Sequence, residues 1–122
     1  MITLKTLPIA NKQQIFDQVA NHMLTQMKKS VIIDENDNIK CFYKNPEGLS
    51  CAAGCLIADD EYDPLFEYQS WGLLVSRGWV PRRNNELIEF LQNIHDYYEP
   101  EAWEDLLREL ANNYKLEWNV NV

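Results

Sequence analysis

The chain has 122 residues, 46% of them hydrophobic and 25% charged, which predicts a single domain over residues 1–122 with one hydrophobic core. No apolar run approaches the roughly 18 to 20 residues that cross a bilayer, so a membrane-spanning helix is excluded. The formal charge of −8 is concentrated after residue 45, where fifteen acidic residues stand against five basic ones. Such a field repels phosphate and attracts cations, so we expect a protein partner and no direct binding of nucleic acid or membrane.

The cysteine count and the N-terminal segment both indicate a reducing compartment. Cys41, Cys51 and Cys55 are an odd number, and a core of this size does not need disulfides. Residues 1–11 lack the basic start and apolar stretch of a secretory signal. We therefore expect free thiols and a cytoplasmic location.

The first predicted helix follows Asn11, which together with Gln14 forms a capping-box pattern. We expect the helix to end near Lys28-Lys29, where the negative helix terminus favours cations. Its apolar residues recur at helical spacing and are expected to face the core: Ile15, Phe16, Val19, Ala20, Met23 and Met27.

A β-hairpin and a short helix are predicted next. The runs 31–33 and 39–43 are rich in β-branched and aromatic residues, and the turn-forming residues 34–38 separate them. After a turn, Ser50 is expected to cap a short helix over Cys51–Ile57, whose small residues allow close approach to another element.

Three further helices are predicted in the second half. Ser70 is expected to cap a short one that ends at Gly78, Asn84 or Asn85 caps the next, and Pro100 opens the last. Residues 116–120 then form an extended tail. The predicted fold is α+β and mainly helical, with one β-hairpin packed against about five helices. The apolar stripe of the middle helix comprises Leu87, Ile88, Leu91, Ile94, His95 and Tyr98.

A thiol-based catalytic site can be drawn from these elements. Cys51 at a helix N-terminus would have its thiolate stabilised by the helix dipole, with His95 as a base and Asp96 orienting the imidazole. His22 is an alternative to His95 as the base, and Asp59 is an alternative to Asp96 as the orienting carboxylate. Core packing is the competing interpretation, because cysteine and an imidazole on an apolar stripe are commonly buried.

A zinc site is the second chemical possibility. Cys41, Cys51 and Cys55 with a histidine could supply tetrahedral ligands, but only the pair Cys51 and Cys55 has the short spacing that structural zinc sites show on both sides. We therefore expect no metal and no other cofactor.

The last two helices carry an acidic surface that could dock against a basic partner, and it includes Glu86, Glu89 and Asp96 of the middle helix. Only Arg108 opposes it. A surface of this kind suits an inhibitor or adaptor, although charged faces also serve solubility alone. Four tryptophans further suggest a homodimer, since aromatic residues are enriched at interfaces. The acidic residues proposed as a protein-binding surface are Glu99, Glu101, Glu104, Asp105 and Glu109.

Three motifs resemble a group of small proteins carried by tailed bacteriophages and prophages. They are Cys41-Phe42-Tyr43, the run from Gly48-Leu49-Ser50-Cys51 to Tyr62, and Leu91-Gln92-Asn93-Ile94-His95-Asp96. The resemblance spans most of the chain and implies action in a bacterial cytosol during infection. It implies no particular activity, cofactor or site. The leading hypothesis is a non-enzymatic accessory protein that binds a host or phage protein; a thiol- or zinc-dependent enzyme and a structural homodimer are the alternatives.

Overall fold

The computed structural model describes residues 1–122 and confirms the predicted α+β class. None of its helices has the length and apolarity needed to cross a membrane. Four α-helices and one antiparallel hairpin are joined by three single turns of 3₁₀ helix. In chain order the elements are η1 (Leu7–Ile9), α1 (Lys12–Gln26), β1 (Val31–Ile33), β2 (Ile39–Cys41), η2 (Ala53–Leu56), η3 (Pro64–Phe66), α2 (Trp71–Ser76), α3 (Asn85–Tyr97) and α4 (Pro100–Asn113).

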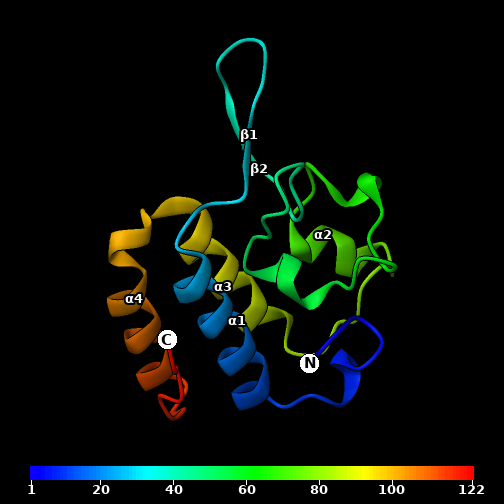
Figure 1. Ribbon diagram of the computed structural model, residues 1–122. Helices are drawn as coiled ribbons and strands as arrows, with labels where there is room; N and C mark the ends of the chain where they lie inside the picture. Colours follow the sequence, from blue (N-terminus) through cyan, green and yellow to red (C-terminus); the bar gives the residue numbers. More distant parts are fainter.

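The helices α1, α3 and α4 pack on one another, while α2 and η2 cover a further side of α3 (Figure 1). One core of 27 buried apolar residues runs through both parts. Its largest fully buried side chains include Trp71 and Trp103, so half of the indoles that suggested an interface are core residues. The long helices therefore act as the scaffold that α2 and the connecting loops complete.

The start of α1 is as predicted. The Asn11 side chain accepts a hydrogen bond from the Gln14 amide at 2.8 Å, and the Gln14 side chain accepts one from the Asn11 amide at 3.0 Å. The predicted apolar face is buried except at Met27. Met27 instead ends the helix in a left-handed conformation with φ of 49°.

The hairpin projects from the helical body, with its base in contact and its tip in solvent (Figure 1). The register pairs Val31 with Cys41 and Ile33 with Ile39. Because no element covers the outer end, Ile33 and Ile39 are 63% and 67% exposed. The Asp34 side chain closes the five-residue loop by accepting the amides of residues 36 and 38.

The segment after Ser50 differs from the prediction. Instead of a capped helix over Cys51–Ile57, the structure has the short 3₁₀ turn η2, and no side chain caps it. Ser50 is drawn into an isolated antiparallel bridge with Lys44, which keeps its backbone extended. The expected close approach is present, because a Cβ on Gly54 would lie 2.1 Å from the Tyr43 carbonyl oxygen.

The remaining helix boundaries follow the sequence closely. Ser70 Oγ accepts the Leu73 amide at 3.1 Å, and Pro100 opens α4. Asn84 precedes α3 as predicted, but its side chain does not cap the helix. Asn84 Oδ1 instead accepts a hydrogen bond from Lys12 Nζ at 2.9 Å, which ties the start of α3 to the start of α1.

Candidate functional site

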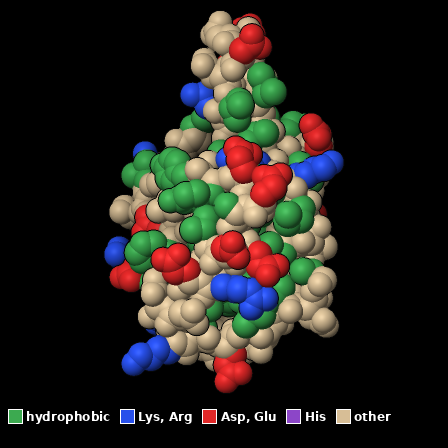
Figure 2. All heavy atoms as spheres, turned by 90° about the vertical axis from the view of Figure 1, so that its left-hand side faces the viewer, with side chains coloured by type: hydrophobic (Ala, Val, Ile, Leu, Met, Phe, Trp, Pro, Cys, Tyr) green, Lys and Arg blue, Asp and Glu red, His purple; other side chains and the backbone are tan.

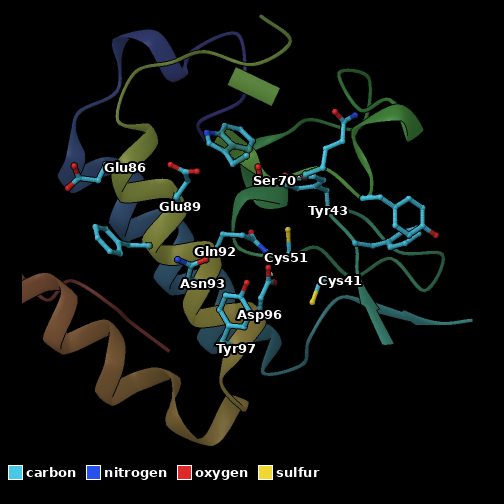
Figure 3. A pocket seen from close by; sticks show the side chains of 15 residues that line it. Cys41, Tyr43, Cys51, Ser70, Glu86, Glu89, Gln92, Asn93, Asp96 and Tyr97 are labelled. Carbon is cyan, nitrogen blue, oxygen red and sulfur yellow. Dashed lines mark hydrogen bonds between the residues drawn. The ribbon is translucent and has the colours of Figure 1, made fainter. Parts of the chain in front are cut away.

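A cleft of about 520 Å³ opens between α3, the chain leaving β2, and the loop that precedes α2 (Figure 3). The buried residues Cys51 and Trp71 belong to its lining. The other residues of this cleft are Cys41, Phe42, Tyr43, Tyr68, Gln69, Ser70, Glu86, Glu89, Phe90, Gln92, Asn93, Asp96 and Tyr97.

Helix α3 supplies about half of the residues that line the cleft, because one of its faces packs in the core and another faces the cleft. Its apolar stripe packs in the core, and a second stripe at spacings of three and four residues turns toward the cleft. Figure 3 shows Glu89, Gln92 and Asp96 projecting from α3 toward the segments that carry Ser70, Tyr43 and Cys51. The members of the second stripe are Glu86, Glu89, Phe90, Asn93, Asp96 and Tyr97.

The cleft is acidic and aromatic. It contains three carboxylates, from Glu86, Glu89 and Asp96, and no lysine or arginine. Exposed rings surround these carboxylates: Tyr68 is 73% and Tyr97 is 77% exposed. Of these five residues, Glu86, Glu89 and Asp96 had been assigned to a predicted acidic surface, whereas Tyr68 and Tyr97 had not been singled out. The signal that could have placed Tyr97 in one site with Glu86 and Glu89 was their helical spacing on the polar side of a strongly amphipathic helix.

The three carboxylates differ in whether they already accept hydrogen bonds from other side chains. Glu86 accepts the Tyr114 hydroxyl at 2.7 Å, and Asp96 accepts the Gln92 amide at 2.7 Å. Glu89 has no hydrogen bond and no ion pair. Its Oε1 lies over the first turn of α2, where a Cβ on Gly72 would be 2.5 Å away. Glu89 is therefore the carboxylate that a bound cation could reach.

A buried hydrogen-bond network lies beside the cleft and fixes the state of His95. The Ser30 amide donates to His95 Nε2 at 3.1 Å, so that nitrogen carries no proton. Nδ1–H donates to Asp96 Oδ1 at 2.8 Å, and the ring stacks on Trp103. The Cys41 sulfur lies within 4.8 Å of ligand atoms of both His95 and Asp96. Burial and the nearby Asp96 charge raise the pKa of the Cys41 thiol to about 12.

This network brings His95 and Asp96 together, as drawn for the thiol site, but pairs them with Cys41. The Cys51 sulfur is buried and accepts the Gly54 amide at 3.3 Å. Burial raises the pKa of Cys51 well above its ordinary value, so the thiol stays protonated. Because both nitrogens of His95 are already engaged, no free lone pair of that imidazole can act as its base.

The other catalytic and metal candidates are also held by structural contacts. The Cys55 thiol donates to the Ala52 carbonyl at 3.2 Å, and burial raises its pKa to about 12. His22 Nε2 donates to the Ser50 carbonyl at 2.9 Å, and burial lowers the pKa of this imidazole. Asp59 is exposed and pairs with Lys44 at 3.4 Å.

One set of potential metal ligands is compact, although it is not the predicted set of three cysteines. Single ligand atoms of Cys41, His95 and Asp96 lie within 4.8 Å of one another. A histidine that binds metal usually donates its second ring N–H to an acceptor. In this structure the Ser30 amide donates to His95 Nε2. With a metal at Nδ1, the ring proton would have to sit on Nε2, where it would face the Ser30 N–H. The alternative is an imidazolate, in which the ring carries no proton. The cluster fits a hydrogen-bond network better than a metal centre.

The acidic surface of α4 is exposed, as expected for a docking or solubility surface. Glu99 pairs with Lys29 at 3.5 Å and Glu104 pairs with Arg108 at 3.1 Å. Figure 2, which faces α4, shows acidic side chains interspersed with hydrophobic and basic ones. The proposed acidic residues without an ion pair are Glu101, Asp105 and Glu109.

Comparison of the chain with protein-family models, with curated proteins and with solved structures found no match. The functional inference therefore rests on the cleft, its charge and its neighbours.

Proposed function

We propose that this chain is a non-enzymatic accessory protein that binds a basic surface of a protein partner at the cleft. The observation that carries the proposal is the composition of the cleft, in which three carboxylates lie among aromatic rings without a single lysine or arginine. The resemblance to phage proteins would place the partner in a bacterial cell.

The rim of the cleft has the chemistry of an interface anchor. Tyr68, Phe90 and Tyr97 are large rings that remain exposed beside a hollow, and such rings are enriched where proteins bind one another. Glu101, Asp105 and Glu109 on α4 extend the negative field beyond the cleft. Charges at the edge of an interface chiefly accelerate encounter, whereas the central contacts determine how long a complex lasts.

The protonated thiols favour binding over catalysis. Cys41 and Cys55 each have a pKa near 12, and Cys51 is buried with a raised pKa. A nucleophilic cysteine needs the opposite shift, toward the thiolate. The thiol-dependent alternative therefore has no activated group to use.

Affinity capture from bacterial lysate with three versions of the chain tests this proposal. We expect the wild type to retain a specific partner and Phe90→Ala with Tyr97→Ala to lose it. A Glu101→Lys and Asp105→Lys variant should capture it more slowly, with a smaller dependence on salt. Circular dichroism would verify that all three versions fold. Equal capture by the wild type and the rim variant, or no specific partner for either, would contradict the proposal.

A second copy of this chain is the alternative partner for the same rim, which would make the protein a homodimer. Light scattering over a range of protein concentrations separates the two cases, because a second copy would raise the mass of the purified chain without any added partner. A constant monomer mass is expected if the rim serves another protein.

A further inference from the structure

We infer that the cleft receives one arginine side chain of the partner, with a carbonyl oxygen of the same peptide accepting from the Trp71 indole. This inference rests on the proposed function and names the group that is recognised. Two unpaired protein groups carry it, one that lacks a cation and one that lacks an acceptor.

The Trp71 indole is the first of these groups. The residue is 1% exposed, and its Nε1 is the one buried side-chain nitrogen or oxygen without a hydrogen-bond partner. The other fully buried indole, Trp103, donates to the Tyr98 carbonyl at 3.0 Å. Buried donors are normally satisfied, so a lone one that lines a cleft points to an acceptor brought by a ligand.

Glu89 is the second group, and it is contributed by α3 to the same cleft. Its carboxylate has no ion pair or hydrogen bond, and it lies against Gly72, the residue that follows Trp71. A basic residue within a peptide offers both missing partners at once, a cation for Glu89 and a backbone carbonyl for the indole. A free anion would meet three carboxylates, so it does not fit.

A metal ion fits less well than an organic cation. Hard cations need several oxygen ligands that converge. Glu86 is held by Tyr114, and Asp96 is held by His95 and Gln92, which leaves Glu89 as the free carboxylate. The volume of about 520 Å³ also lies within the range of pockets that take organic groups.

Arginine is favoured over lysine by the surrounding rings. A guanidinium is planar, stacks on aromatic faces and can donate two parallel hydrogen bonds to one carboxylate. Phe90 and Tyr97 lie on the same stripe of α3 as Glu89, at spacings of one and eight residues, and Tyr68 lines the cleft from another segment. An ammonium group would gain the charge interaction and lose the planar contacts.

The test uses three blocked amino acids as probes: N-acetyl-arginine methylamide, the lysine equivalent, and the citrulline equivalent, which has nearly the shape of arginine without its charge. Two-dimensional NMR of the ¹⁵N-labelled chain would follow the Trp71 indole resonance. A single blocked residue is expected to bind on the order of millimolar. We expect the arginine probe to move this resonance, the lysine probe to bind several-fold more weakly, and the citrulline probe to leave it unchanged.

Two matched variants assign the charge contact. Glu89→Gln should weaken binding of the arginine probe at least tenfold, while Glu35→Gln, which removes the same charge from the exposed tip of the hairpin, should bind it as the wild type does. Because neither variant alters the core, both should fold. Equal binding of the arginine and citrulline probes, an unchanged affinity in Glu89→Gln, or shifts confined to residues outside the cleft would overturn the inference.

The result also separates this inference from the proposed function. If lysate capture depends on the rim but the arginine probe never moves the Trp71 resonance, the cleft binds a partner by other means and the arginine assignment is wrong. If the arginine probe binds through Glu89 but no partner is captured, the cation site stands and the protein-binding role is contradicted.

Discussion

Replacing Gly54 with alanine should test the packing that positions the cleft. A Cβ at this position would lie 2.1 Å from the Tyr43 carbonyl oxygen and 2.9 Å from its carbonyl carbon. Tyr43 cannot easily retreat, because its amide donates to Glu67 at 2.8 Å and its hydroxyl donates to the Gln69 carbonyl at 2.6 Å. Relieving the clash between the added Cβ and the Tyr43 carbonyl would therefore require the backbone of η2 to move and hydrogen bonds to break.

The expected cost of Gly54→Ala is about 3 kcal/mol or more, at the upper end of the range for overpacking. For a chain of this length that corresponds to a fall in Tm of roughly 10 °C. Urea unfolding followed by tryptophan fluorescence and by circular dichroism would measure the change in the free energy of unfolding.

Gly72→Ala is the matched control for this substitution. Its Cβ would also meet a close neighbour, but that neighbour is the carboxylate end of Glu89, which can rotate away. Alanine within α2 also gains helix propensity, so the variant should stay within about 1 kcal/mol of wild type. If Gly54→Ala were as stable as Gly72→Ala, the argument that η2 is pinned against Tyr43 would be refuted.

Three further predictions concern titration. With a pKa of about 12, the Cys55 thiol should be alkylated at neutral pH about 1,000-fold more slowly in the folded chain than in urea, as mass spectrometry can measure. Because the pKa of Cys55 in the folded chain lies above its ordinary value of 9.0, this thiol leaves the free energy of unfolding unchanged below about pH 9. That free energy should then fall by about 1.4 kcal/mol per pH unit between about pH 9 and 12. His22 acts in the opposite direction: its lowered pKa gives stability that is present above about pH 6.5 and is lost as the pH falls. His22→Gln, which can still donate to the Ser50 carbonyl, should flatten the dependence between pH 7 and 5, and an unchanged slope would count against this assignment.

The features that sequence analysis predicted correctly are those encoded by neighbouring residues. The Asn11 and Gln14 capping box, the Ser70 cap and Pro100 at the start of α4 each depend on a few adjacent positions, and the structure confirms them. The apolar stripe of α3 is likewise a local pattern, and it is buried as predicted except at Tyr98, which lies beyond the last turn of the helix and is 49% exposed. Even His95 was correctly expected to be buried, because it lies on that stripe.

What could not be predicted depends on pairs of residues far apart in the chain. Ser50 has the chemistry of a cap, but its bridge to Lys44 decides its conformation. The His95 tautomer is determined by the Ser30 amide, 65 positions away, which no local pattern reveals. The cleft is harder still to predict, since its lining comes from four separated segments. Its most informative atom, Trp71 Nε1, stands out only because no partner approaches it.

The projecting hairpin has a practical consequence for engineering the chain. Its strands of three residues are supported by no third strand, and an isolated hairpin of this size is marginally stable in water. The Asp34 side chain closes its loop locally, so the core contributes nothing to the tip. Insertion of a peptide tag between Asn36 and Asp37, or circular permutation with new termini there, should therefore leave the helical body folded.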